Sequence, residues 1–351
     1  MLLAALCMTS AAAQRPGDRL LVCNKSAGTL SVFDAVDHRE IATLRIGGRP
    51  HEVAVSADGR TAVVTDYGAG RAGSSITVLD VARGERTRTI ELQLAHADGD
   101  GEARFSRPHG VQFVSPSEVL VTSEATGHVV LVDVAAGRVQ RATPTGQRSS
   151  HLVAASPEFG YALISCPVDG TVVRLDLLAA AGAEDHRSIR VGGGAEGIAL
   201  HPRSGDLWVA VRDEDALVVV SPQTLAVTAR LDTGRLPLRV AFTPDGARAL
   251  VTCTKSGELM IFDAATRSVV GEVSIHGDRS EASSLPLAVV SDPDARRAYV
   301  TCARGEFVAV VDLASAELVG RIDARAGPDG VAYARPLPLP AADQRPRRKT
   351  P

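Results

Sequence analysis

The stretch LRVAFTPDGARALVTCTKSGELMIFD, residues 238–263, contains three short apolar segments separated by turns. The first turn, TPDGA at 243–247, is typical of a tight connection between antiparallel strands. Each apolar segment is too short for an ordinary helix. The stretch therefore predicts three consecutive strands, and the run SVVGEVSI at 268–275 adds a fourth.

The same unit recurs along the chain. Its most regular feature is a strand that ends in Asp, or once in Ser, at intervals of 42 to 53 residues; the seven positions are Asp34, Asp80, Asp133, Asp176, Ser221, Asp263 and Asp312. One four-stranded sheet cannot bury both of its faces without neighbours. A repeat of this length with four short strands therefore predicts the blades of a β-propeller.

The two ends of the chain complete one blade. The first unit lacks its leading strand, while GPDGVAYA near the C-terminus is a leading strand with nothing after it. Joining residues 330–334 to the strands at 20–46 closes the ring and removes the exposed edges of an open sheet. We therefore predict an all-β, seven-bladed β-propeller over residues 14–335, with four antiparallel strands in each blade.

Both termini indicate segments outside the propeller. Residues 1–13 are apolar and then small, with Ala11 and Ala13 placed as in a cleavage site, which predicts a signal peptide. The apolar run is short and no Lys or Arg precedes it, which leaves open a truncated signal. We expect the protein to be periplasmic or secreted. Residues 336–351 are rich in Pro and Arg and predict a disordered tail.

Composition excludes several classes of partner. The chain has 38 basic and 41 acidic side chains, a balance too even to attract nucleic acid or an anionic membrane. No later stretch approaches the roughly 20 apolar residues of a transmembrane segment. The spacing of Cys23, Cys166, Cys253 and Cys302 predicts no particular disulfide. We expect a monomer.

Three stretches resemble a known repeat family. VCNKSAGTLSVFDA, GGRPHEVAVSADGRTAVVTD and AFTPDGARALVTC are similar to the YVTN-type (YncE-like) β-propeller repeats of exported bacterial and archaeal proteins. The resemblance covers nearly all of residues 20–335 and implies the propeller architecture. It implies little about function, because the family consists mostly of scaffolds of mixed or unassigned role.

The repeated Asp that ends each third strand has a structural interpretation. It lies away from the propeller axis, and its natural partners are the main-chain amides of the turn that follows. Ser221 can make the same hydrogen bonds more weakly. We therefore expect turn stabilisation here and not a ring of metal ligands.

A second set of equivalent positions lies just before the innermost strand of each blade, and we call it the mouth column. From blade one round the ring it consists of Asp329, His51, His109, His151, Glu196, Leu238 and Leu287. Innermost strands line the axis of a propeller, and the connections that enter them lie on one face. The three histidines and two carboxylates should therefore form one continuous arc at the mouth of the channel.

Two interpretations of this arc remain open. Imidazole nitrogens suit zinc, copper, iron or nickel, so His51, His109 and His151 are candidate ligands of a divalent transition metal. Glu196 or Asp329 would then be a fourth ligand or orient a ring, or act as general acid or base in an enzyme. Alternatively, the histidines line a water-filled channel without a ligand.

Four arginines precede the mouth column by two or three residues: Arg49, Arg107, Arg148 and Arg235. Guanidinium groups there could bind a carboxylate or phosphate, or they could be solvated. The ends of the second strands, from Asn24 to Cys302, are expected mainly to pack between blades.

Three long insertions, at 67–75, 92–107 and 275–286, should emerge on the same face. Within the second, Asp98, Asp100 and Glu102 have the alternation of a calcium loop without its full pattern, so an acidic lid is the preferred interpretation.

No sequence motif of a familiar enzyme class is present. We therefore expect an exported propeller that acts as a binding or scaffold protein, with a small anion or a protein partner at the His- and Arg-rich mouth. The alternative is a metal-dependent enzyme that acts on a small anionic substrate at the same place.

Overall fold

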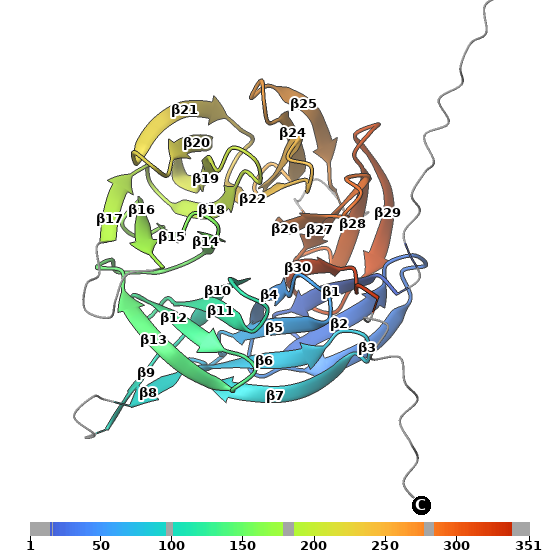
Figure 1. Cartoon of the computed structure of the whole chain (residues 1–351). Coiled ribbons are helices and arrows are strands. Elements are labelled where there is room, and N and C mark those ends of the chain that lie inside the picture. The colour runs from blue at the N-terminus through green and yellow to red at the C-terminus, as the bar shows by residue number, and fades with distance from the viewer. Residues whose placement is uncertain (1–14, 16, 96–100, 178–185, 277–283, 339–351) are drawn as a thin grey trace, which may run out of the picture.

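The computed structural model describes residues 15, 17–95, 101–177, 186–276 and 284–338. These residues form seven four-stranded antiparallel sheets arranged radially around a common axis (Figure 1). The prediction of an all-β, seven-bladed propeller is confirmed. A two-stranded ribbon of β8 (Gln93–Ala95) and β9 (Glu102–Arg104) projects outward beside blades 2 and 3.

The strands of blades 1 to 3, in chain order within each blade, are β1 (Arg19–Asn24), β2 (Thr29–Asp34) and β3 (Glu40–Arg45); β4 (Pro50–Val55), β5 (Thr61–Asp66), β6 (Ser75–Asp80) and β7 (Glu85–Glu91); and β10 (Pro108–Phe113), β11 (Glu118–Ser123), β12 (His128–Asp133) and β13 (Arg138–Pro144). Blades 4 and 5 consist of β14 (Val153–Ser156), β15 (Tyr161–Cys166), β16 (Thr171–Asp176) and β17 (His186–Arg190); and β18 (Ala195–Leu200), β19 (Leu207–Val211), β20 (Ala216–Ser221) and β21 (Ala226–Asp232). Blades 6 and 7 consist of β22 (Pro237–Phe242), β23 (Arg248–Cys253), β24 (Glu258–Asp263) and β25 (Val269–Ser274); and β26 (Pro286–Ser291), β27 (Arg297–Cys302), β28 (Phe307–Asp312) and β29 (Glu317–Asp323). A last strand, β30 (Pro328–Ala334), completes blade 1.

The ring closes as the sequence predicts. β30 pairs antiparallel with β1, so the innermost strand of blade 1 comes from the end of the chain. Arg335, just after β30, donates to Asp18 and to Asp294 of blade 7, with N–O distances of 2.9 to 3.3 Å. Tyr333 also donates to Asp18, at 2.8 Å. We call this set of contacts the closure seam.

Burial explains the sequence pattern of each blade. The two middle strands are almost wholly buried, as in β5 and β6, because a neighbouring blade covers each face. The outermost strands alternate or are mostly exposed, as in β3. The innermost strands are of mixed burial, since one edge of each blade faces the axis.

Seven apolar clusters form the core, one between each pair of adjacent blades. Trp208 of blade 5, for example, contacts the ring edges of Phe242 and Phe262 of blade 6. The core is therefore distributed round the ring, and the axis is left free to carry polar groups.

The repeated Asp has the structural role that we expected. Asp34, Asp80, Asp133, Asp263 and Asp312 each end a third strand, and an Oδ1 atom accepts main-chain N–H groups of the following turn at 2.7 to 3.4 Å. In the part of the chain that the structure describes, none of these carboxylates belongs to a group of side chains that could hold a metal ion.

Further expectations concern the cysteines, membrane-spanning segments, the ends of the chain and the possible calcium loop. Cys23, Cys166, Cys253 and Cys302 are buried and unpaired, consistent with the absence of a predicted disulfide. Among the described residues, the only helix is the short 3-10 turn η1 (Arg212–Glu214), and none is long or apolar enough to span a bilayer. The predicted signal peptide, most of the predicted tail, and Asp98 and Asp100 of the possible calcium loop lie outside the described residues.

Candidate functional site: a histidine cluster at the mouth of the channel

The sequence predicts that the mouth column lies just before the innermost strands. The structure instead places it inside these strands. Six of its seven residues are the second residue of their strand, and only His151 precedes its strand. In those six blades the pairing register shifts at this point. Such bulges redirect side chains locally, so the column is presented at one end of the axis.

Hydroxyl groups fix the main chain of the column between blades. Thr65 of blade 2 donates to the carbonyl of His109 in blade 3 at 2.9 Å, and Thr122 of blade 3 donates to the carbonyl of His151 in blade 4 at 2.6 Å. The same contact recurs round the ring from Ser165 to Glu196, from Thr252 to Leu287 and from Thr301 to Asp329. The backbone of the column is therefore held by the second strand of the preceding blade.

The two remaining interfaces use a glycine. The second strand there carries Cys23 or Ala210, which has no hydroxyl. A Cβ atom added to Gly330 would lie 2.3 Å from the carbonyl oxygen of His51, and one added to Gly197 would lie 2.4 Å from that of Leu238. Only glycine allows the main chains to approach this closely.

The three predicted histidines lie together. The ring centroids of His51 and His109 are 3.8 Å apart and those of His109 and His151 are 3.7 Å apart. The three residues are only 8%, 3% and 8% exposed. In each ring the Nδ1 atom is buried and has no hydrogen-bond partner. A buried polar atom without a partner costs free energy, so this cluster differs from an ordinary solvated rim.

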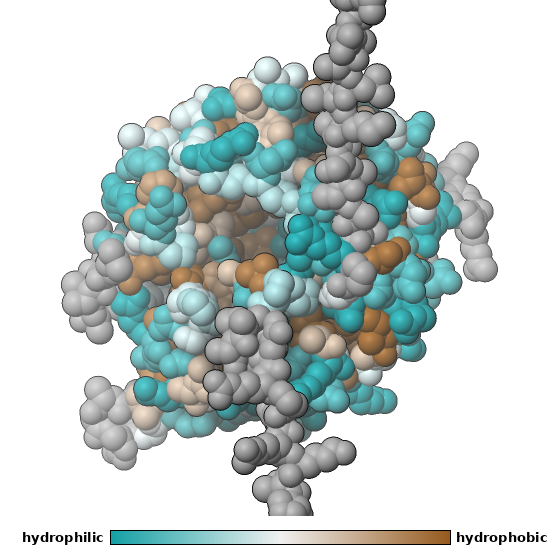
Figure 2. All heavy atoms as spheres, turned by 45° about the vertical axis from the view of Figure 1, so that its right-hand side comes forward, coloured by the Kyte–Doolittle hydropathy of each residue, from teal (hydrophilic) through white to brown (hydrophobic). Residues whose placement is uncertain are grey.

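The cluster borders a cavity of about 320 Å³. Its lining includes both predicted carboxylates and the two leucines of the column; the residues are Lys25, Arg49, His51, Tyr67, His109, Glu124, His151, Leu152, Glu196, Leu238, Arg239, Leu287 and Asp329. Figure 2 shows a hollow at the centre of the ring with apolar residues in its wall. The prediction that these side chains converge on the axis is therefore consistent with the geometry.

His51 is held by a cation. Its Nε2 atom lies 2.6 Å from Nζ of Lys25, and an ammonium group can only donate. In the neutral ring the proton is therefore on Nδ1, which faces Asp329 at 3.5 Å and Glu52 at 3.7 Å. Lys25 in turn pairs with Asp329 at 3.1 Å. The lone pair of His51 is thus already used within the protein.

His151 is held by an anion. Its Nε2 atom lies 2.9 Å from Oε1 of Glu196, and the other oxygen of Glu196 accepts from Arg212 at 2.6 Å. Burial acts to raise the pKa of Glu196, but the adjacent His151 and Arg212 hold it below its ordinary value. The carboxylate accepts the Nε2–H proton, so neutral His151 has its lone pair on Nδ1. That Nδ1 atom is 3.9 Å from Oε1 of Glu124.

His109 lies between the other two rings. Burial, together with the charges of His151 and His51, holds its pKa well below the usual range for histidine. The ring is therefore neutral near pH 7 and offers a lone pair without releasing a proton first.

The acidic groups of the site differ in their partners. Glu52 of blade 2 pairs with Arg239 of blade 6 across the axis, and although burial opposes ionisation, Arg239 and His51 lower the pKa of Glu52 to about 2. Glu124 accepts a hydrogen bond from Tyr67, whose pKa is raised by burial and by this carboxylate. Within the described residues Glu124 has no ion pair with a lysine or arginine.

Two groups of three side chains could each hold a metal ion, with their ligand atoms within 4.8 Å of one another. One consists of His51, Glu52 and His109, and the other of His109, Glu124 and His151. In the first group, Lys25 holds His51 and Arg239 holds Glu52. The second group keeps free lone pairs and an unneutralised carboxylate, so it is the better candidate for a cation.

The four predicted arginines do not act as one set. Arg49 lines the cavity. Arg107 is not a lining residue, but its guanidinium lies over the ring of Tyr67, which is one, at 4.9 Å from the ring centre. Arg148 pairs with Asp169 at 2.7 Å. Arg49, Arg148 and Arg235 are all exposed, but only Arg49 is among the lining residues.

Sequence reasoning missed several side chains of the site. Lys25, Tyr67, Glu124 and Arg212 each follow the last residue of a second strand, one position beyond the strand ends that we had compared. Extending that comparison by one residue would have found them. Glu52 and Arg239 each come one position after a residue of the mouth column, His51 and Leu238 respectively. Nothing in the sequence indicates that they pair across the axis.

The insertions at 67–75 and 92–107 meet beside the site. The main-chain N–H of Arg107 donates to the carbonyl of Gly73 at 2.8 Å. Most of the third insertion, 275–286, lies outside the described residues.

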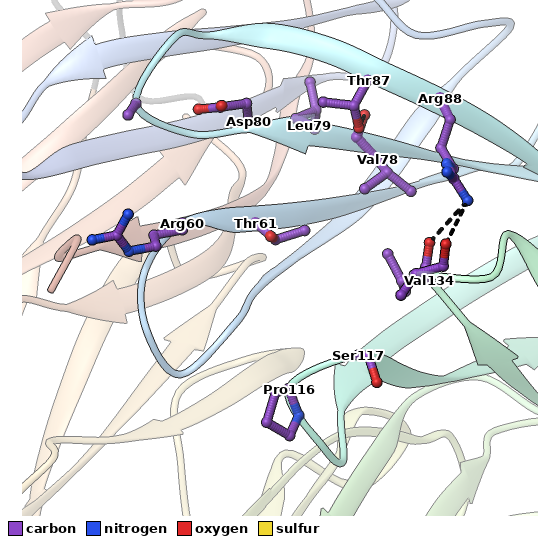
Figure 3. A pocket seen from close by; sticks show the side chains of 12 residues that line it. Arg60, Thr61, Val78, Leu79, Asp80, Thr87, Arg88, Pro116, Ser117 and Val134 are labelled. Carbon is purple, nitrogen blue, oxygen red and sulfur yellow. Dashed lines mark hydrogen bonds between the residues drawn. The ribbon is translucent and has the colours of Figure 1, made fainter. Parts of the chain in front are cut away.

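Another cavity, of about 480 Å³, lies between blades 2 and 3 (Figure 3). There Arg88 donates to the carbonyls of Val134 and Ala135 at 3.3 and 3.0 Å. Arg88 thus bridges the two blades, and the lining residues form no cluster of metal-ligating side chains within the described part of the chain.

The chain matches no protein-family model and no curated protein. Solved structures with the same fold include a functionally unknown protein from Desulfotomaculum acetoxidans DSM 771, with a TM-score of 0.73, 15% identity, and coverage of 91% of this chain and 99% of that chain. Hydrazine synthase of Kuenenia stuttgartiensis has a TM-score of 0.65 at 16% identity, and the match covers 80% of this chain and 88% of that chain. Apo AztD from Citrobacter koseri has a TM-score of 0.65 at 13% identity, and the match covers 91% of this chain and 98% of that chain. At these identities the likeness shows the fold alone.

Proposed function

We propose that the protein binds one divalent transition-metal ion at the mouth of its channel, through His109, His151 and Glu124. The observation that carries the proposal is a pair of adjacent, buried rings, those of His109 and His151, whose Nδ1 atoms have no hydrogen-bond partner. Ligand atoms of both rings and a carboxylate oxygen of Glu124 lie within 4.8 Å of one another. Such atoms are costly to bury unless a ligand satisfies them.

The donor set indicates which ions fit. Two imidazoles and a carboxylate suit zinc, iron, nickel or copper better than magnesium or calcium. Glu196 supports this set because its contact with Nε2 of His151 resembles the carboxylate–histidine pairs that orient metal ligands in other proteins. Arg212 holds Glu196 in turn.

Binding is better supported than catalysis. Glu196 and Asp329 were the candidate general acid and base, but each is held in an ion pair, with Arg212 and Lys25 respectively. The lowered pKa of Glu196 disfavours a proton donor at neutral pH. The signal peptide predicted for residues 1–13 would direct export, so we propose that the ion is bound in the periplasm or outside the cell.

Metal analysis of the protein, purified without a histidine tag, tests the proposal. We expect one tightly bound ion per chain, complete loss in His109→Ala, and strong loss in Glu124→Gln. Glu124 is partly exposed, so its replacement should leave the fold intact even if His109→Ala proves unstable.

His186→Ala is the matched control, because it removes an exposed imidazole from blade 4. It should retain the full metal content. Equal metal content in the wild type, Glu124→Gln and His186→Ala, or no metal in any of them after incubation with Zn²⁺, would contradict the proposal.

A further inference from the structure

The charges around the cavity balance before any ion binds. Four acidic and four basic side chains line it or pair directly with those that do: Glu52, Glu124, Glu196 and Asp329 against Lys25, Arg49, Arg212 and Arg239. With neutral histidines the formal charge of the site is zero. A divalent ion at the proposed site brings two positive charges, and Glu124, the one acidic group there that has no lysine or arginine partner among the described residues, compensates only one of them. Buried charge is stable only when it is paired, so one positive charge is left over.

The site also has too few ligands for a transition metal. His109, His151 and Glu124 supply three, whereas zinc prefers four and the other candidate ions four to six. The cavity measures about 320 Å³, far more than a single ion requires. Space is therefore available for a small molecule that completes the coordination.

Arg49 lies where such a molecule would contact it. Arg49 is exposed and its side chain lines the open side of the cavity, and within the described residues its guanidinium makes no ion pair or hydrogen bond. Arg148, at a similar position before the column in blade 4, instead donates to Asp169 from its Nε atom and its main-chain N–H, and its Nη2 atom donates to the carbonyl of Val168. An unpaired guanidinium beside a cation site favours an anion with two oxygen atoms.

We propose that the metal ion is bound together with a small oxyanion of the carboxylate type, one oxygen on the metal and another on the guanidinium of Arg49. This inference rests on the proposed function and names the second component of its ligand. The anion supplies negative charge and fills a coordination position at the same time. The protein would then recognise a metal–carboxylate pair and not a bare ion.

Visible spectroscopy of the Co²⁺-loaded protein tests this inference, with acetate as the probe in a buffer free of other oxyanions. We expect a saturable change in the cobalt absorption bands as acetate is added. Replacing Arg49 by Met should raise the half-saturating acetate concentration by about tenfold or more, which is the usual loss for one charged hydrogen bond. Arg148→Met should leave it unchanged.

The cobalt content is measured first, by dialysis, so that the two proposals can fail separately. One cobalt per chain without any effect of acetate, or the same acetate dependence in Arg49→Met, would overturn the oxyanion and leave the metal site in place. Failure to bind cobalt would overturn both.

Discussion

The closure seam and the histidine cluster both bury charged side chains that come from distant parts of the chain. At the seam, Arg335 makes paired contacts to Asp18 and Asp294, and Asp18 also accepts from Tyr333. At the cluster, the Nδ1 atoms of three imidazoles have no hydrogen-bond partner, although carboxylates lie within 3.9 Å of two of them. The seam is satisfied by the protein itself, and the cluster is not.

This difference separates architecture from function. A buried polar group that is fully paired has a sufficient reason in the fold, since it specifies how the ring closes. A buried group left unpaired needs another explanation, and a ligand is the most direct one. We therefore expect substitutions at the seam to change stability without changing metal content, and substitutions around the cluster to do the reverse.

The largest expected effect is on stability, from Arg335→Met. The substitution leaves Asp18, whose side chain is 2% exposed, as a buried carboxylate without its cation. Breaking a buried ion pair in this way costs about 3 kcal/mol. Urea unfolding monitored by circular dichroism measures the loss, and metal content per folded chain should stay at the wild-type value.

Arg325→Met is the control for this prediction. Arg325 pairs with Glu40 in an exposed setting, with side chains 48% and 34% accessible. Such pairs contribute less than about 1 kcal/mol. If the two variants lose the same free energy of unfolding, the ion pairs of the closure seam contribute no more to stability than an exposed ion pair.

A smaller effect, confined to metal binding, is expected from Glu196→Gln. The neutral amide no longer holds His151 with a charge, although it keeps nearly the same shape and can still contact Arg212. Loss of a carboxylate that orients a metal ligand weakens affinity by about 10- to 100-fold. Isothermal titration with Zn²⁺ measures the change.

Glu214→Gln provides the matched control, because Glu214 is a partly exposed acid near the same end of blade 5, paired with Arg230 and not with a histidine. The Glu214→Gln variant should bind Zn²⁺ with the same affinity as the wild type. If Glu196→Gln binds Zn²⁺ as tightly as this control, Glu196 does not orient a ligand.

The fold could be predicted almost completely because a propeller repeats one pattern, and each strand is set by its own apolar residues and turns. Glycine and Asp at the turns and the unmatched strand at 330–334 were enough to count the blades and close the ring. The convergence of His51, His109 and His151 followed from the same symmetry, since equivalent positions in a ring share one face.

The chemistry of the site depends on contacts that symmetry does not determine. The sequence treats the three histidines as equivalent, but Lys25 holds one ring and Glu196 holds another, which gives them opposite proton positions. The pairing of Glu52 with Arg239, 187 residues away, depends on side-chain reach across the axis. For the same reason the sequence could not distinguish Arg49, which lines the cavity, from Arg148, which does not.

The central claim is that His109 and His151 each offer a nitrogen lone pair to an ion, His151 through Nδ1, while His51 does not. Nitrogen-15 NMR of the histidine side chains, recorded before and after one equivalent of Zn²⁺ and assigned with single variants, tests it most directly. We expect the Nδ1 resonance of His151 and one ring-nitrogen resonance of His109 to move to the range of metal-bound nitrogen, and the Nδ1 resonance of His51 to remain that of a protonated nitrogen. Unchanged resonances for all three rings, or ligation by His51 in place of His151, would contradict the account.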